Sequence, residues 1–127
     1  MRDHNLSKAN VVSIGITNQR ETTTAFDFAS GEFLHNSLVW LDTRTKEVVH
    51  EILAKNGNDV DKYRGICGLP LNTFFFMVKM MWLLKHSDKV RAAKDKGTLK
   101  FCTVDSWLVY VSFDITVETE QQDFFLH

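Results

Sequence analysis

An arginine followed directly by a glutamate, Arg20 and Glu21, is the residue pair with the clearest chemical potential in this sequence. The guanidinium is a planar fork of hydrogen-bond donors, and an ionised carboxylate only accepts hydrogen bonds. A neutral polyol needs both kinds of partner, because each hydroxyl donates one proton and accepts others. Trp40 lies within a later apolar run, residues 38–41, and could supply an apolar wall for the carbon side of the same molecule.

Each of these residues also has a plain structural interpretation. Arg20 and Glu21 could form a solvated ion pair in a polar turn, a contact worth under about 1 kcal/mol. Tryptophan at the end of a strand commonly packs in a core, so Trp40 need not touch a ligand. The chemistry of the three residues leaves both interpretations open.

Runs of β-branched and apolar residues predict the strands that would carry this turn. Residues 10–17 are dense in valine and isoleucine and are expected to form a buried strand. Residues 22–28 and 33–41 are expected to form an antiparallel hairpin, because the Ser30–Gly31 turn separates them. The charged pair would lie between the first and second strands, and the tryptophan near the end of the third.

Helical periodicity predicts the remaining elements. Residues 45–55 place apolar side chains on one face, with Asp42 or Thr43 as the N-cap. Residues 74–84 are almost entirely apolar and predict a helix buried nearly all round. Three further elements are expected: a short helix within 59–65, a helix over 90–96 capped by Ser87, and a strand from 101 that turns into a helix at 105. Interleaved strands and helices indicate the α/β class.

Composition narrows the functional classes. A chain of 127 residues predicts one domain, and a formal charge of −1 argues against nucleic acid or an anionic membrane as a partner. The longest apolar run is interrupted by Lys79 and is too short for a membrane span. Cys67 and Cys102 are expected to be buried, reduced thiols. Reduced thiols and a polar N-terminus without a signal sequence predict a cytoplasmic location.

Four blocks of the sequence, in matching order and with matching gaps, resemble the FGGY carbohydrate kinases, and within that family the glycerol kinases. The blocks are residues 12–23, 38–45, 73–84 and 103–108, within a likeness that covers roughly 6–110. The resemblance implies a ribonuclease-H-like fold of the actin, hexokinase and sugar kinase superfamily, incomplete in this chain. Residues 1–110 would be part of the kinase N-terminal domain, and residues 111–127 a divergent C-terminal tail.

The resemblance also implies roles for individual residues. Arg20 and Glu21 would hydrogen-bond the hydroxyls of glycerol, and Trp40 would lie against its carbon atoms. Phe74 takes the place of a tyrosine whose hydroxyl contacts glycerol, which removes a hydrogen bond worth about 0.5–1.5 kcal/mol. Phe76 adds apolar volume where the family has a smaller residue. A fragment of another FGGY sugar kinase is therefore an alternative.

The activity implied by the resemblance is transfer of a phosphoryl group from ATP to glycerol, giving glycerol 3-phosphate. That reaction needs a phosphate cradle, Mg²⁺ and a carboxylate near the attacking hydroxyl. We expect the ATP and Mg²⁺ sites to be absent or incomplete here, with no catalytic residue and no metal ligand in this chain. The isolated chain would then be inactive, and the alternative is a fragment that binds glycerol weakly or associates with a second copy or a full-length kinase.

Overall fold

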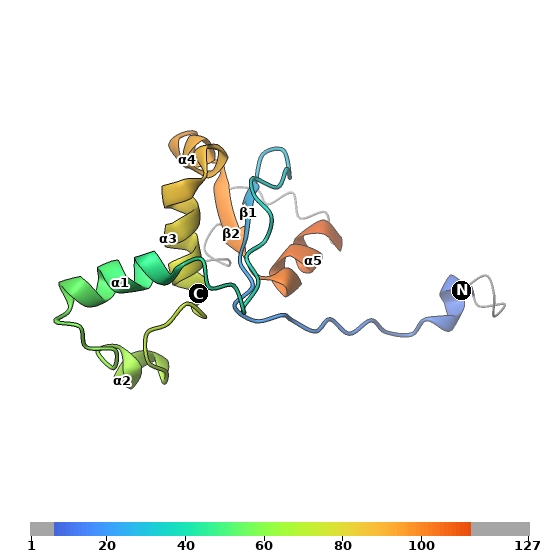
Figure 1. The fold of residues 1–127 in the computed structure, drawn as a ribbon. Coiled ribbons are helices and arrows are strands. Elements are labelled where there is room, and N and C mark those ends of the chain that lie inside the picture. Colours follow the sequence, from blue (N-terminus) through green and yellow to red (C-terminus); the bar gives the residue numbers. More distant parts are fainter. Residues whose placement is uncertain (1–6, 113–127) are drawn as a thin grey trace.

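The computed structural model describes residues 7–112 of the chain (Figure 1). Helices dominate, and two short strands lie among them, so the predicted mixture of α and β elements is confirmed. The elements in chain order are η2 (Lys8–Asn10), β1 (Thr24–Asp27), α1 (Lys46–Lys55), α2 (Arg64–Cys67), α3 (Phe76–His86), α4 (Asp88–Asp95), β2 (Leu99–Cys102) and α5 (Val104–Ser112).

The two strands pair with each other although they are far apart in the sequence. β1 and β2 are antiparallel, with Thr24 opposite Cys102 and Asp27 opposite Leu99. The predicted hairpin is only partly present: residues 33–38 run beside β1 but touch it through two isolated bridges, Thr23 with Leu38 and Phe26 with Phe33. Backbone hydrogen bonds also join Leu34 to Ala25 and Asp27 to Glu32, but the pairing does not extend into a continuous ladder.

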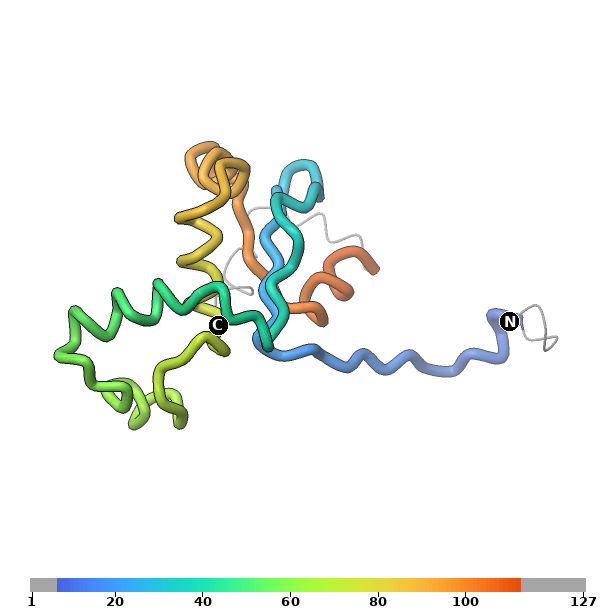
Figure 2. The backbone as a smooth tube through the Cα atoms, viewed as in Figure 1, coloured from blue at the N-terminus to red at the C-terminus, as the bar shows by residue number. Residues whose placement is uncertain are grey.

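The prediction of a buried strand over residues 10–17 is wrong. Asn10 ends η2, and residues 11–17 are extended but pair with no other segment among residues 7–112, leading away from the helices (Figure 2). Val12 is 96% exposed and Ile14 is 85% exposed. A strand is held by hydrogen bonds to a neighbouring strand, so valine and isoleucine content alone cannot bury it.

Helix α3 joins the two halves of the hydrophobic core. One cluster gathers around β1 and contains Ala25, Leu38, Leu83 and Val90. The other lies between α1 and α3 and contains Val48, Val49, Leu71 and Val78. Trp82 packs against both clusters. The prediction that α3 is buried nearly all round is wrong, because Met77 and Met81 face solvent.

Apolar periodicity and capping residues in the sequence predicted the positions of the helices better than the identity of their N-cap residues. α1 matches the predicted helix, but its N-cap is Thr45 without a side-chain hydrogen bond, so neither Asp42 nor Thr43 caps it. α4 begins as predicted, because the Ser87 hydroxyl accepts a hydrogen bond from the Val90 amide. The expected short helix is displaced towards the C-terminus and forms as α2, while residues 59–63 are turns.

The two thiols differ. Cys102 is buried at the end of β2, as predicted, but Cys67 at the end of α2 is exposed, so that prediction is wrong. α2 is a single short turn of helix whose residues contribute nothing to either core cluster, which explains the exposure. Residues 113–127 of the predicted tail lie outside the described part of the chain.

Candidate functional site

The turn before β1 directs Glu21 towards a helix far along the sequence. Its backbone is left-handed, with φ of 64°, and the Thr22 amide donates to the Gln19 carbonyl to close the turn at 3.2 Å. The Glu21 carboxylate then accepts a hydrogen bond of 2.5 Å from the backbone amide of Phe76, the first residue of α3. A carboxylate at a helix N-terminus satisfies an unpaired donor and faces the positive end of the helix dipole.

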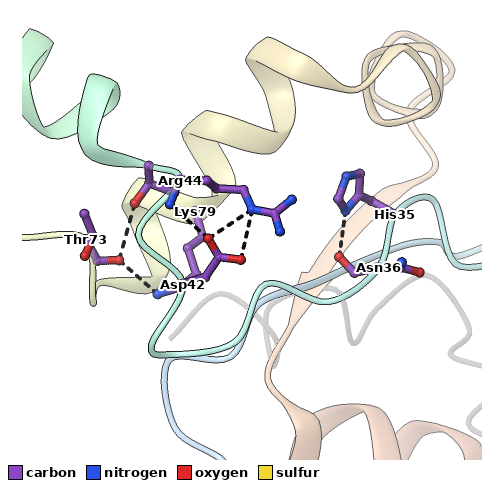
Figure 3. Close-up of polar contacts among 7 residues, drawn as sticks. His35, Asn36, Asp42, Arg44, Thr73 and Lys79 are labelled. Carbon is purple, nitrogen blue, oxygen red and sulfur yellow. Dashed lines mark hydrogen bonds and ion pairs between the residues drawn. The ribbon is translucent and has the colours of Figure 1, made fainter.

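Lys79 lies one turn further along α3 and is fully buried. Its Nζ donates to the Thr73 carbonyl at 3.1 Å (Figure 3). It also donates to the Phe74 carbonyl at 2.5 Å, and both carbonyls belong to the segment that leads into the helix. Burial lowers the pKa of the Lys79 ammonium, and the negative charges of Glu21 and Asp42 oppose that shift. The ammonium is therefore held between backbone carbonyls and two acidic residues.

Asp42 and Arg44 form a contact beside this lysine (Figure 3). The Arg44 Nε lies 2.9 Å from one Asp42 carboxylate oxygen and 3.0 Å from the other, and the Arg44 amide also donates to Asp42. Partial burial opposes ionisation of Asp42, but the hydrogen bonds and charge of Arg44 outweigh it. The pKa of Asp42 consequently lies below its ordinary value.

Trp40 and Phe74 meet near the same end of α3. Their rings pack edge to face with centroids 6.3 Å apart, and the Lys79 ammonium lies 5.9 Å from the centre of the Phe74 ring. The Trp40 amide donates to the Thr22 hydroxyl at 3.2 Å, which ties the tryptophan to the turn that carries Glu21. Trp40 keeps 43% of its surface exposed, so it is not a core residue.

Arg20 and Glu21 do not form the ion pair that their adjacency suggested. The Arg20 side chain is exposed, and it makes no salt bridge or hydrogen bond with residues 7–112. Glu21 points inward to α3 instead. Of the four residues predicted to bind substrate, three gather around the N-terminal end of α3: Glu21, Trp40 and Phe74. The roles of all four in binding glycerol stay predictions.

A cavity of about 650 Å³ opens beside this group. Its lining is mainly apolar and comes from α1, α2, α3 and the loops between them, including Ile52, Tyr63, Leu71, Phe76 and Met81. Glu21 contributes a carboxylate to its wall, whereas Trp40 and Phe74 do not line it. The volume suits a small molecule, but a polyol needs more hydrogen-bonding partners than this lining offers.

Sequence reasoning did not identify the role of Lys79. A signal was present, since Lys79 is the one charged residue within the apolar run 74–84, and an ammonium that is buried there needs hydrogen-bonding partners. Among residues 7–112, no group of three or more His, Cys, Asp or Glu side chains is arranged to hold a metal ion. In the same range, no helix has the length and apolar character required to cross a membrane.

Comparisons with known proteins show the family to which the chain is similar. Residues 1–121 match the family model described as the FGGY family of carbohydrate kinases, N-terminal domain. A glycerol kinase of Methylorubrum populi is 45% identical over 105 residues, which are 83% of this chain and 21% of that protein. A glycerol kinase of Nocardia farcinica is 42% identical over 110 residues, or 87% of this chain and 22% of that protein.

The chain is also similar in structure to a solved glycerol kinase. The crystal structure of Plasmodium falciparum glycerol kinase with ADP superposes with a TM-score of 0.65 and 41% sequence identity. The match covers 76% of this chain and 19% of that kinase chain. The present chain thus spans about a fifth of the length of the relatives it matches.

Proposed function

The chain belongs to the FGGY family of carbohydrate kinases, and from this we propose that it carries part of the glycerol-binding pocket of an ATP-dependent glycerol kinase. The fold expected from the sequence, an incomplete N-terminal domain of the ribonuclease-H-like, actin-like type, is confirmed. Phosphorylation of glycerol by the whole protein is part of the proposal, because the chain spans only about a fifth of its relatives.

One observation carries the proposal. Glu21, Trp40 and Phe74 are far apart in the sequence, yet they lie around one end of α3, where Glu21 reaches the Phe76 amide and Trp40 packs on Phe74. A carboxylate can accept hydrogen bonds from hydroxyl groups, and a half-exposed indole offers an apolar face to carbon atoms. Arg20, exposed at the preceding position, would supply donors once a polyol is bound.

The proposal gives these residues binding roles and assigns no catalytic residue to the chain. ATP supplies the phosphoryl group in the proposed reaction, and Mg²⁺ neutralises charge on it. Residues 7–112 present no cluster of three or more His, Cys, Asp or Glu side chains that could hold a metal ion.

Glycerol titration of the 127-residue chain, followed by heteronuclear NMR, tests the proposal directly. We expect saturable shifts of resonances from Trp40, Glu21 and Phe74. Arg20→Gln should weaken binding about tenfold or more, since a lost hydrogen bond to a charged group is worth about 1.5–3 kcal/mol. Propan-1-ol is the matched control ligand, because it keeps the three-carbon chain and lacks two hydroxyls. Equal responses to both alcohols, or no saturable response to glycerol, would refute the proposal.

A second candidate function is association with a full-length kinase chain. The exposed valine and isoleucine side chains of residues 11–16 favour it, because an extended segment without a partner strand can add to the sheet edge of another protein. Co-purification of tagged chain with an intact glycerol kinase tests this function. Replacing Val12 and Ile14 by threonine should abolish the association, and independent migration of the unmodified chain would contradict it.

A further inference from the structure

We infer that Lys79 is a positioning residue of the proposed glycerol-binding site. Its buried ammonium group holds the Glu21 carboxylate and the Phe74 ring in place. The inference rests on the proposed function for its meaning, since it assigns Lys79 to the same site. This role extends the proposed function, because Lys79 would orient the substrate-binding residues and would not itself contact the substrate.

Lys79 is hydrogen-bonded to the segment that leads into α3. Its ammonium donates to two successive carbonyls, those of Thr73 and Phe74. Two donations to neighbouring peptide groups fix the orientation of that backbone, and the Phe74 ring extends from it towards Trp40. Thr45 strengthens the same arrangement, because its hydroxyl donates to the Thr73 carbonyl at 3.5 Å.

The charge of the Lys79 ammonium is balanced by acidic residues nearby. A fully buried ammonium is stable only when its charge and its donors find partners. Glu21 and Asp42 lie close enough for their charges to act on Lys79, although neither comes within salt-bridge distance of its Nζ. Arg44 already binds the Asp42 carboxylate, whereas the Glu21 carboxylate has no cation within salt-bridge distance among residues 7–112 and accepts from the Phe76 amide, one turn of α3 before Lys79. Attraction between Lys79 and Glu21 therefore draws Glu21 inward, towards the N-terminus of α3.

A lysine that positions the site differs in its replaceability from a lysine that only supports the fold. A buried charge is expensive, and apolar residues of similar volume often replace one without loss of stability. Methionine would fill the space of Lys79 but would neither donate to the two carbonyls nor attract Glu21. A lysine that only filled the core would be replaceable by methionine without change at the site, whereas a positioning lysine would not.

The test uses the full chain and the variants Lys79→Met and Lys79→Gln, with Lys85→Met as the matched control on the exposed side of α3. In protein without ligand, the Phe76 amide should resonate far downfield because of its charge-assisted hydrogen bond to Glu21. We expect Lys79→Met to move that resonance upfield and to change the Trp40 indole resonance. Lys79→Gln, which can still donate to a carbonyl, should give a smaller change, and Lys85→Met should give none.

Glycerol affinity provides the second readout. We expect Lys79→Met to weaken binding about tenfold or more, Lys79→Gln to weaken it less, and Lys85→Met to leave it unchanged. If wild-type chain binds no glycerol, the proposed function fails, but the resonances without ligand still test the positioning role. Unchanged Phe76 and Trp40 resonances in folded Lys79→Met would overturn the inference. Failure of both Lys79 variants to fold would also overturn it, because Lys79 would then serve the fold itself.

Discussion

Removing the negative charge of Glu21 should destabilise helix α3, although the two lie 55 positions apart in the sequence. The N-cap position of α3 is occupied by Phe75, whose side chain cannot accept a hydrogen bond. The Asn72 side chain accepts from the Phe74 amide, which precedes the helix, and does not reach the first turn. The Phe76 amide therefore depends on Glu21 for a partner that no nearby residue supplies.

The magnitude follows from this geometry. A carboxylate at an exposed helix N-terminus contributes about 0.3–1 kcal/mol, and a partly buried one contributes up to about 2 kcal/mol. Glu21 is half-buried and lies 2.5 Å from the amide nitrogen, which places it in the upper part of that range. Glu21→Gln keeps an accepting oxygen but loses the charge, and should cost about 1–1.5 kcal/mol. Glu21→Ala also removes the hydrogen bond and should cost about 2–3 kcal/mol.

Urea unfolding of the 127-residue chain, followed by tryptophan fluorescence, measures both free energies, and the denaturant slope should stay unchanged. Glu32→Gln is the matched control, because the Glu32 side chain is 69% exposed and its ion pair with Lys89 is long, at 3.9 Å. That variant should fall within about 0.5 kcal/mol of wild type, as surface substitutions usually do. If Glu21→Gln shows no larger effect than Glu32→Gln, the carboxylate does not stabilise α3 and the reasoning fails.

Further predictions concern other parts of the fold. Gly97→Ala should destabilise by about 1 kcal/mol in urea unfolding, because φ there is +74°, whereas Gly65→Ala should be neutral or stabilising. Leu83→Ala should cost about 2–5 kcal/mol by the same measurement, since the side chain is fully buried. A thiol reagent should modify Cys67 in native protein and Cys102 only after unfolding; equal rates would contradict the burial of Cys102. Burial raises the pKa of Cys102 from 9.0 to about 12, so between those values the unfolded thiol ionises first and stability should fall, a loss that Cys102→Ala should remove.

The residues that carry family membership were recognisable from the sequence, and so was the approximate position of most helices. Helix α4 is the clearest case, because Ser87 caps it and Gly97 ends it within a short stretch of chain. Prediction was weaker for strands. Residues 10–17 have strand composition but no partner among the described residues, and β1 pairs mainly with β2 instead of with the segment that follows it.

The candidate site shows the same division. The sequence shows which side chains are available, and their chemistry supports the prediction of a polyol site. Packing of distant segments is what turns Glu21 inward while Arg20 stays in solvent, and what buries Lys79 against the Phe74 carbonyl. The physical reason is range. Periodicity and capping act between residues a few positions apart, whereas burial of a charge depends on groups that meet only when distant segments pack together.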